Sequence, residues 1–393
     1  MITLTRAATA ALLACAVALP ATALPASAAA PAVTASAAAD PAPAPLQLPA
    51  PTGTERVGSS VLHLVDRSRK DPWVPSADGR ELMVTLHYPA ARRGHGAPAP
   101  YATENEARLL LRGVQVEDPA AARALAGMGT YSERDLRPAP GRHPLVLLSP
   151  GFGVPRFTLT SLAVELASRG YVVASVDHAY ETSGTELPDG RVLTCVACTA
   201  LEGGTHGSVV TAARAADVRF LLDRLTGPRA AWRYAAAIDR SRIGMAGHSI
   251  GGAAAAKAML GDRRIDAGVN MDGSFWDTLP AKGLGGRPFL LLGTDDETHR
   301  PGGVDTTWDA TWPVLGGWKR WLTVAGTDHF SFSDGPVLQR HFGLPAGDIP
   351  ADRALAVTRA YVAAFFDRSL RGEERRLLAG PSPLYPEVRF NQP

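Results

Sequence analysis

The residues best suited to chemistry lie in the sequence GHSIG at 247–251, which places Ser249 in a G-x-S-x-G pattern. The apolar residues 241–246 precede this pattern and the alanine-rich residues 253–260 follow it, so we expect a strand, a sharp turn and a helix. Such a turn strains the backbone of the serine, and flanking glycines let strand and helix pass closely. This context predicts that Ser249 is a nucleophile rather than part of an ordinary glycine-rich turn.

A serine nucleophile needs a base that takes its proton and an acid that orients the base. The base is expected after the last strand of the sheet, and His329 follows the predicted strand 321–325, ahead of the final helix. Most of the ten histidines are expected to be surface or structural residues, and the other late ones, His299 and His341, are placed less well. We therefore predict that His329 is the general base.

Two aspartates compete for the role of the orienting acid. Asp272 follows the predicted strand 265–271, whereas Asp295 follows the predicted strand 288–292 and begins an acidic cluster. Both are carboxylates at strand ends, so the residues alone leave the choice open. We expect the acidic cluster to be a solvated loop. The weaker alternative is a calcium site formed by Asp295, Asp296, Glu297 and Asp305.

The charge that develops on an attacked carbonyl oxygen needs two backbone N–H donors, which form an oxyanion hole. The first candidate is the N–H of Ile250, directly after the nucleophile and at a helix N-terminus. The second is the N–H of Phe152, in the sequence SPGFG at 149–153 that ends the predicted strand 144–149. The glycines of this loop let the backbone approach a ligand, and its position favours this role over that of a simple turn.

The elements that must position these residues alternate along the chain. Continuous apolar strands with helices between them indicate an α/β fold, with a doubly wound, mostly parallel sheet and helices on both faces. Ligands in such sheets bind at the carboxyl ends of the strands. The predicted strands are 82–88, 144–149, 171–176, 242–246, 265–271, 288–292 and 321–325, and the predicted helices are 158–169, 208–225, 253–260 and 351–370.

The chain has 393 residues and is 46% hydrophobic, which allows one large core. Residues 1–30 contain one arginine, an apolar run and an A-x-A cleavage site, and therefore indicate a secretory signal peptide. The alternative is a lipoprotein anchored through Cys15, whose sequence LLAC resembles a lipobox. Residues 31–52 are rich in alanine and proline and predict a disordered linker, which leaves 53–393 as the catalytic domain.

One stretch of this domain differs from the rest. Residues 94–142 form a polar insertion bounded by prolines, in which 101–111 and 118–128 are predicted to be short helices. The insertion precedes the predicted strand 144–149, so it lies beside the expected site. It is either a flap near that site or a decoration, and the sequence leaves both open.

The overall charge and the cysteines limit the partners and the chemistry. A net charge of +2 gives no indication of nucleic-acid or anionic-membrane binding, and no later apolar run is long enough to span a bilayer. Cys195 and Cys198 are expected to form a structural disulfide, because a redox pair would open a helix and this pair lies in a loop rich in threonine and glycine. We expect no metal, no cofactor and a monomer.

The chain resembles the platelet-activating factor acetylhydrolase-like branch of the α/β-hydrolases over most of residues 53–370. The resemblance implies an α/β-hydrolase fold and a secreted carboxylic ester hydrolase, an esterase or lipase that acts on a small-molecule or lipid ester. Pro150 departs from the family pattern, which often has histidine there. The motifs that carry the resemblance are GFG at 151–153, AGHSIGG at 246–252, NMD at 270–272, GTDHFSFSD at 326–334 and AFFDRSLRG at 364–372.

The resemblance also bears on the acid and on the reaction. The family places its acid 23 positions after the serine, and 249 + 23 = 272, which implies Asp272; cutinase and polyester-hydrolase relatives use the later strand, which implies Asp295. The implied reaction passes through an acyl-enzyme on Ser249. The alternatives are a peptidase or acyltransferase on the same fold and a non-catalytic secreted binding protein. Four tryptophans, at 308, 312, 318 and 321, either line the substrate pocket or pack in the core.

Overall fold

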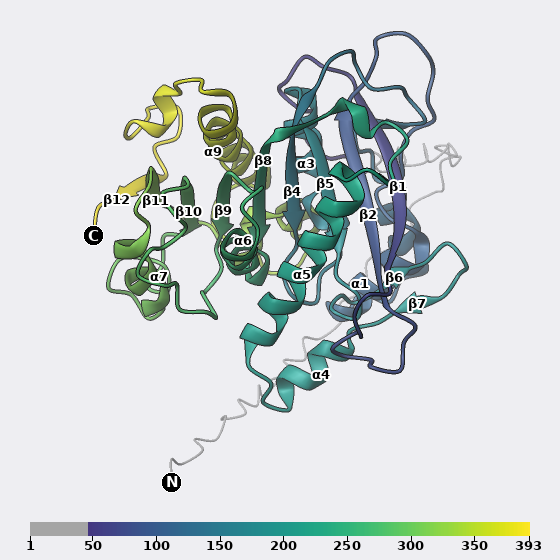
Figure 1. Ribbon diagram of the computed structural model, residues 1–393, viewed down its shortest axis with the longest axis horizontal. Coiled ribbons are helices and arrows are strands. Elements are labelled where there is room, and N and C mark those ends of the chain that lie inside the picture. The colour runs from purple at the N-terminus through teal and green to yellow at the C-terminus, as the bar shows by residue number, and fades with distance from the viewer. Residues whose placement is uncertain (1–45) are drawn as a thin grey trace, which may run out of the picture. The chain divides into compact units, whose positions relative to one another are not determined.

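The computed structural model describes residues 46–393; the predicted leader, Cys15 and the first part of the predicted linker lie outside the described residues. Within 46–393, a ten-stranded sheet has helices on both faces (Figure 1). Its strands, in their order across the sheet, are β12 (Val388–Asn391), β11 (Lys319–Val324), β10 (Phe289–Thr294), β9 (Ala267–Met271), β8 (Ile238–His248), β4 (His143–Ser149), β5 (Val172–Asp177), β2 (Arg80–Pro89), β1 (Val57–Asp66) and β3 (Ser132–Arg134).

The central strands, from β11 across to β5, run parallel to one another, and β12 and β2 flank them in antiparallel orientation. The chain goes from β4 to β5 on one side and then returns to place β8 on the other side of β4. The strand order therefore reverses between β4 and β8, which is where doubly wound sheets bind ligands. The predicted fold class, a doubly wound α/β-hydrolase sheet, is confirmed.

Four helices cover the sheet and form a core on each of its faces. Helices α5 (Gly207–Thr226) and α6 (Ile250–Gly261) pack on one face, and α3 (Thr160–Ser168) and α9 (Ala351–Arg371) pack on the other (Figure 1). The connections contain the shorter elements, which are α1 (Glu104–Gly113), α2 (Pro119–Ala126), α4 (Val196–Glu202), α7 (Thr306–Thr311), α8 (Gly335–Phe342), the strands β6 (Thr185–Glu186) and β7 (Val192–Leu193), and the 3-10 helices η1 (Arg156–Leu159), η2 (Ala235–Ala237), η3 (Trp312–Val314), η4 (His329–Phe332) and η5 (Arg376–Leu378).

Each predicted strand and helix is present, with its ends shifted by a few residues. The sequence analysis missed strands β1, β3, β6, β7 and β12 and helices α4, α7 and α8. Within residues 46–393, β1 pairs only with β2 and with the three-residue strand β3, and Gly58 and two serines follow its first residue, Val57, so it lacks a continuous apolar run. Edge strands that are partly exposed give this weaker signal because only some of their side chains face a core.

Residues 46–52, which were predicted to belong to the disordered linker, pack against the domain. Leu48 is 2% exposed and its N–H donates to the Gly129 carbonyl at 3.0 Å. The N–H of Thr52 donates to Glu165 Oε2 at 2.8 Å. The linker boundary was therefore placed too late, because leucines among the prolines of this segment supply apolar surface that the domain buries.

The insertion contains the two predicted helices, α1 and α2, which pack against each other and against Leu48 in a third apolar cluster. The Thr103 hydroxyl accepts the backbone N–H of Glu106, and the Glu106 carboxylate accepts the backbone N–H of Thr103. This reciprocal pair is a capping box at the start of α1. No helix within residues 46–393 has both the length and the apolar character needed to cross a membrane.

Candidate active site

Ser249 lies between β8 and α6, at the carboxyl end of the sheet. Its backbone has φ 55° and ψ −129°, a conformation that a non-glycine residue adopts only under strain. Its N–H donates to the carbonyl of Met271 at 2.7 Å, which ties the turn to the end of β9. The strand, strained turn and helix expected around Ser249 are therefore present, and the serine is half-buried at the surface of the site.

The glycines of the motif are required by close backbone approach. A Cβ atom at position 247 would lie 2.1 Å from the backbone of Gly251, and one at position 251 would lie 2.2 Å from the carbonyl oxygen of Ser149. Real Cβ atoms do not come this close to backbone atoms, so larger residues would push α6 away from β8 and from the loop after β4.

Asp272 and His329 are in direct contact. Asp272 follows β9 with φ 57° and is 2% exposed, and its Oδ2 accepts a hydrogen bond from His329 Nδ1 at 2.6 Å. Its other oxygen, Oδ1, accepts the N–H of Thr294 at 2.7 Å. Because Nδ1 of His329 is occupied by the carboxylate, Nε2 is the nitrogen left for proton transfer. His329 begins η4 after β11, and its side chain is 45% exposed.

His248 connects the histidine loop to the nucleophile turn. Its Nε2–H donates to the backbone carbonyl of His329 at 2.7 Å, and the two rings lie 4.8 Å apart between centroids. Burial, with a smaller contribution from the neighbouring His329, lowers the pKa of His248 to about 4, so this ring is a neutral donor. The structure thus places His329 against the residue next to Ser249. Among the hydrogen bonds of residues 46–393, none joins Ser249 Oγ to His329.

Asp295, the alternative acid, contacts different residues. It is almost fully buried after β10, where its carboxylate pairs with Arg300 Nε at 2.9 Å and Arg389 Nη1 at 2.6 Å and accepts Thr323 Oγ1 at 3.1 Å. The structure therefore brings Asp272, and not Asp295, to His329. Within 46–393 no three or more His, Cys, Asp or Glu side chains gather as a metal site, and Asp295, the first residue of the calcium alternative, is paired with two arginines instead.

The two candidate oxyanion donors lie on adjacent strand ends. Phe152 is in the loop after β4, and Ile250 is the first residue of α6 after β8. Neither N–H donates to another group within residues 46–393. A Cβ at position 151 would lie 2.9 Å from His248 Nδ1, so the loop passes close to the nucleophile turn. Both N–H groups are thus free donors beside Ser249.

The sequence analysis set His299 aside as a base and did not predict its contact with the second carboxylate oxygen of Asp272. The ring is 4% exposed, with Nδ1 2.9 Å from Asp272 Oδ1 and Nε2 3.4 Å from Asp305 Oδ2. Burial disfavours the charged ring, but the two carboxylates outweigh it and raise the pKa of His299 to about 9. Burial likewise opposes the charge of Asp272, yet His299 and His329 hold its pKa well below the usual range. An ionised Asp272 is the form that can accept the Nδ1–H of His329.

The raised pKa of His299 predicts how stability depends on pH. Its folded-state pKa of about 9 exceeds the ordinary value of 6.5, so its stabilising effect is complete below pH 6.5 and is lost as the pH rises through 9. We expect the free energy of unfolding to fall by up to roughly 3 kcal/mol more in the natural protein than in His299→Gln across this range. Urea unfolding at pH 6 and pH 9.5 measures the free energy of unfolding of both proteins. Equal changes in the two proteins would contradict the raised pKa of His299.

The tryptophans pack in the core rather than line the site. Trp308 and Trp321 are fully buried, and their indole N–H groups donate to the carbonyls of Gly273 at 2.7 Å and His299 at 2.9 Å. They therefore support the loops that carry Asp272 and His299. Trp312 and Trp318 are half-buried beneath arginine and lysine side chains.

An apolar groove of about 750 Å³ extends from His329. Its walls come from three places in the chain: the end of α1 and its following turn, the loop after β4, and α8 with the segment after it. Helix α1 belongs to the insertion, so the insertion contributes to the wall beside the candidate base. The apolar lining residues include Leu110, Leu111, Val114, Val154, Phe330, Leu338, Phe342 and Leu344.

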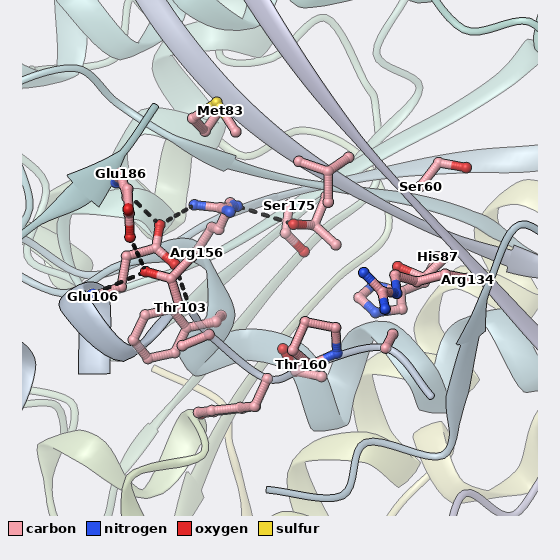
Figure 2. A pocket seen from close by; sticks show the side chains of 18 of the residues that line it. Ser60, Met83, His87, Thr103, Glu106, Arg134, Arg156, Thr160, Ser175 and Glu186 are labelled. Carbon is pink, nitrogen blue, oxygen red and sulfur yellow. Dashed lines mark hydrogen bonds and ion pairs between the residues drawn. The ribbon is translucent and has the colours of Figure 1, made fainter. Parts of the chain in front are cut away.

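A second cavity, of about 490 Å³, lies between β1, β2 and the segment that leads into α1. Figure 2 shows its polar lining, in which Arg156 bonds to Glu106 and the Glu186 carboxylate accepts from Thr103. None of the residues predicted for catalysis lines it. Glu106 and the groove residue Leu110 lie one turn apart on α1, so this helix contributes to the walls of both cavities.

The predicted disulfide is confirmed. Cys195 and Cys198 are bonded, with their Cα atoms 5.3 Å apart. Its predicted place in a loop is wrong, because Cys195 is the N-cap of α4 and Cys198 lies in the first turn of that helix. The threonine and glycine residues that suggested a loop come later, and Gly203 ends the helix.

Comparisons with known proteins relate this chain to esterases. Residues 124–186, which include β4, the loop after it and β5, match the family model of platelet-activating factor acetylhydrolase, isoform II. A probable 1-alkyl-2-acetylglycerophosphocholine esterase from Arthroderma benhamiae is 33% identical over 383 residues, covering 87% of this chain and 93% of that protein. A crystallised ferulic acid esterase from Streptomyces cinnamoneus is 45% identical and superposes with a TM-score of 0.80, covering 89% of this chain and 100% of that one.

These similarities extend over nearly the whole described domain, well beyond the short family match. They cover 87% and 89% of this chain, so the fold is shared with esterases. The chain belongs to the platelet-activating factor acetylhydrolase family of α/β-hydrolases and is a carboxylic ester hydrolase.

Proposed function

We propose that this chain is a secreted serine esterase, with Ser249 as nucleophile, His329 as base and Asp272 as orienting acid, which hydrolyses esters that carry an extended apolar group. The observation that carries the proposal is the 2.6 Å contact between Asp272 Oδ2 and His329 Nδ1, next to the strained backbone of Ser249. A histidine held through Nδ1 by a buried carboxylate is the arrangement that activates a serine.

The proposed reaction has two stages. Ser249 Oγ attacks the ester carbonyl carbon while His329 Nε2 takes its proton, and the N–H groups of Phe152 and Ile250 stabilise the oxyanion. The ester C–O bond then breaks as His329 gives this proton to the leaving alcohol oxygen, which leaves an acyl group on Ser249. A water molecule, deprotonated by His329, attacks the acyl carbon. The bond between this carbon and Ser249 Oγ then breaks as His329 returns the proton to Oγ, which releases the acid. Each step uses only groups of this chain and water.

The apolar groove supports the substrate class. It begins at His329, so a substrate whose ester carbonyl lies at Ser249 can place one of its two apolar ends along it. Burial of each methylene in such a groove contributes about 0.8 kcal/mol, or about a fourfold gain in kcat/KM per methylene until the groove is filled. This supports esters with a chain or ring longer than acetyl on at least one side, a description that fits both alkyl glycerophospholipids and aryl esters.

Substitution within the groove is expected to change substrate preference. Leu110→Asn places a polar amide in the wall, and we expect kcat/KM for p-nitrophenyl decanoate to fall about tenfold while that for p-nitrophenyl acetate changes less. The matched control is Leu109→Asn on the same helix, because Leu109 does not line the groove and packs against Gly184. Equal losses for both esters, or equal effects of both variants, would contradict this role of the groove.

A covalent probe tests the proposed nucleophile directly. A fluorophosphonate forms a bond between its phosphorus and the serine oxygen with loss of fluoride, and peptide mass spectrometry then locates the label. We expect the label on Ser249 and a complete loss of ester hydrolysis in the labelled protein. An unlabelled, inactive protein would favour a binding protein on the same fold, and ester exchange that outpaces hydrolysis in excess alcohol would favour an acyltransferase.

A panel of esters tests the substrate class. The probes are p-nitrophenyl esters of rising chain length, 1-alkyl-2-acetylglycerophosphocholine and methyl ferulate, all at matched concentration. We expect kcat/KM to rise with chain length over several methylenes. A maximum at acetate with no gain from a longer acyl or alcohol group would overturn this part of the proposal.

Export rests on residues 1–30, which lie outside the described structure. We propose cleavage after the sequence ASA at 26–28, followed by release from the cell. N-terminal sequencing of the protein from the culture medium is expected to begin just after residue 28. Recovery in the membrane fraction with a lipid on Cys15 would instead show the anchored form.

A further inference from the structure

A fully buried arginine, Arg214, binds the loop that carries Phe152. Arg214 projects from α5, which crosses one face of the sheet (Figure 1), and its side chain has no exposed surface. Its Nη1 donates to the carbonyl of Pro150 at 2.5 Å and to Ser149 Oγ at 3.2 Å. Its Nη2 donates to the carbonyl of Gly151 at 3.4 Å. Arg214 thus bonds to consecutive positions of this loop.

These bonds decide which way the peptide between Gly151 and Phe152 faces. Residues 46–393 contain no cis peptide bond, so the C=O and N–H of this peptide point in opposite directions. Because the Gly151 carbonyl points to Arg214 in the core, the Phe152 N–H points away from the core. Rotation of this peptide would remove the donor from the site and leave a buried arginine unpaired, at a large cost.

Glu181, which binds Arg214, also binds the far end of the loop at Gly153. Glu181 Oε2 accepts Arg214 Nε at 2.7 Å, and the Glu181 carbonyl accepts the Gly153 N–H at 3.0 Å. Burial opposes the charge of Glu181, but Arg214 and Arg80 hold its pKa below the usual range. The loop is therefore fixed on both sides of Phe152, at positions 150–151 by Arg214 and at position 153 by the Glu181 backbone.

The arginine belongs to a larger buried set of charges. Arg80 is also without exposed surface, and it pairs with Asp71 at 2.9 Å, Glu181 at 2.7 Å and Asp217 at 2.8 Å. Arg80 shares Glu181 with Arg214 but contacts no carbonyl of the loop; its only backbone acceptor among residues 46–393 is Ala179. The chain therefore supplies two equally buried arginines in one network, of which only Arg214 contacts the oxyanion loop.

We propose that Arg214 is a positioning residue for catalysis, which keeps the Phe152 N–H directed at the developing oxyanion. This inference rests on the proposed function, because it assumes that Phe152 serves the tetrahedral intermediate formed on Ser249. Arginine suits the role because its planar fork serves Glu181, Ser149 and two carbonyls at once, and the single ammonium group of lysine does not reach the same set. Its effect is expected in the transition state rather than in substrate binding.

The test compares Arg214→Lys with Arg80→Lys. Loss of an oxyanion donor lowers kcat by about 10²–10³-fold, and partial displacement of the loop by less, so we expect Arg214→Lys to lower kcat about 10–100-fold with KM within about twofold. Affinity for a trifluoromethyl ketone, which forms a tetrahedral adduct with the serine, should fall by a similar factor. Arg80→Lys should lower the Tm as much as Arg214→Lys does, but its kcat per folded enzyme should stay within about threefold of that of the natural protein.

Ser149→Ala keeps the test decisive if Arg214→Lys does not fold, because it removes a neutral partner of Arg214 Nη1 and leaves every charge in place. We expect a fall of about two- to fivefold in kcat, with a matching loss of ketone affinity. The inference is overturned if the variants of Arg214 and Ser149 lose stability but keep kcat and ketone affinity, or if Arg80→Lys lowers kcat equally. Failure of Ser249 to take the fluorophosphonate label would instead refute the proposed function itself.

Discussion

Replacement of Ser249 by alanine is expected to lower kcat for p-nitrophenyl butyrate by on the order of 10⁶-fold, which leaves only the residual catalysis that the oxyanion hole and substrate binding supply. The loss is expected to be this large because the proposed acyl-enzyme forms on the oxygen of this hydroxyl. The fold should persist, because the strained turn is held by the Ser249 backbone and not by its side chain. The N–H donates to Met271 and the carbonyl accepts the N–H of Gly252 at 2.8 Å.

Single-turnover and steady-state assays on the purified variant measure this loss. Ser241→Ala is the matched control, since Ser241 is an exposed serine in the same strand, β8. The backbone strain and the backbone bonds of the turn are the same with alanine, so the Tm of both variants should stay near the natural value and is measured beside the assay. Substantial ester hydrolysis by Ser249→Ala would refute the role of this serine.

The residues that sequence could predict are those that follow strand ends. Ser249 and Asp272 come directly after a recognisable strand, and His329 lies in the loop after another. A parallel sheet brings the carboxyl ends of its strands to one edge. Their local sequence therefore carried most of the information about their position. The choice between Asp272 and Asp295 needed the fold, because both follow strands and only the structure shows which of them His329 contacts.

The residues that sequence missed depend on contacts between distant parts of the chain. Arg80 and Asp217 are separated by 137 positions, and neither follows a motif. One signal was available: Arg214 and Asp217 interrupt the apolar face of α5, which includes Val210, Val218 and Leu221 at helical spacing. Charged residues on a buried face need partners, so this interruption indicated a buried ion network, although not the loop that it supports.

His299 illustrates a different limit. The sequence analysis did not choose His299 as the base because it follows β10 rather than β11. In the structure, His329 and not His299 contacts Asp272 Oδ2. His299 instead contacts Oδ1 of the same carboxylate. The arrangement of one aspartate with a histidine at each oxygen could not be predicted from the sequence. The two histidines lie in separate loops and share no sequence pattern.

Replacement of Asp272 by asparagine is expected to lower kcat by about 10³–10⁴-fold while the fold is retained. Asparagine nearly matches the shape of aspartate, but its amide is neutral. It neither stabilises the protonated form of His329 nor ensures the tautomer in which Nδ1 carries the hydrogen and Nε2 is free to accept one. The loss falls on kcat because the imidazolium exists only once the proton of Ser249 has been transferred. KM should change by no more than a few-fold.

Asp295→Asn is the matched comparison, because Asp295 is an equally buried aspartate at the end of the neighbouring strand, β10. Its carboxylate pairs with Arg300 and Arg389, so its removal should lower the Tm by a few degrees and leave kcat within about threefold of the natural value. The decisive quantity is the ratio of the two kcat values, measured on folded protein with one chromogenic ester. If kcat collapsed in Asp295→Asn alone, Asp295 after β10 would be the orienting acid. The Asp272–His329 contact would then only support the loop.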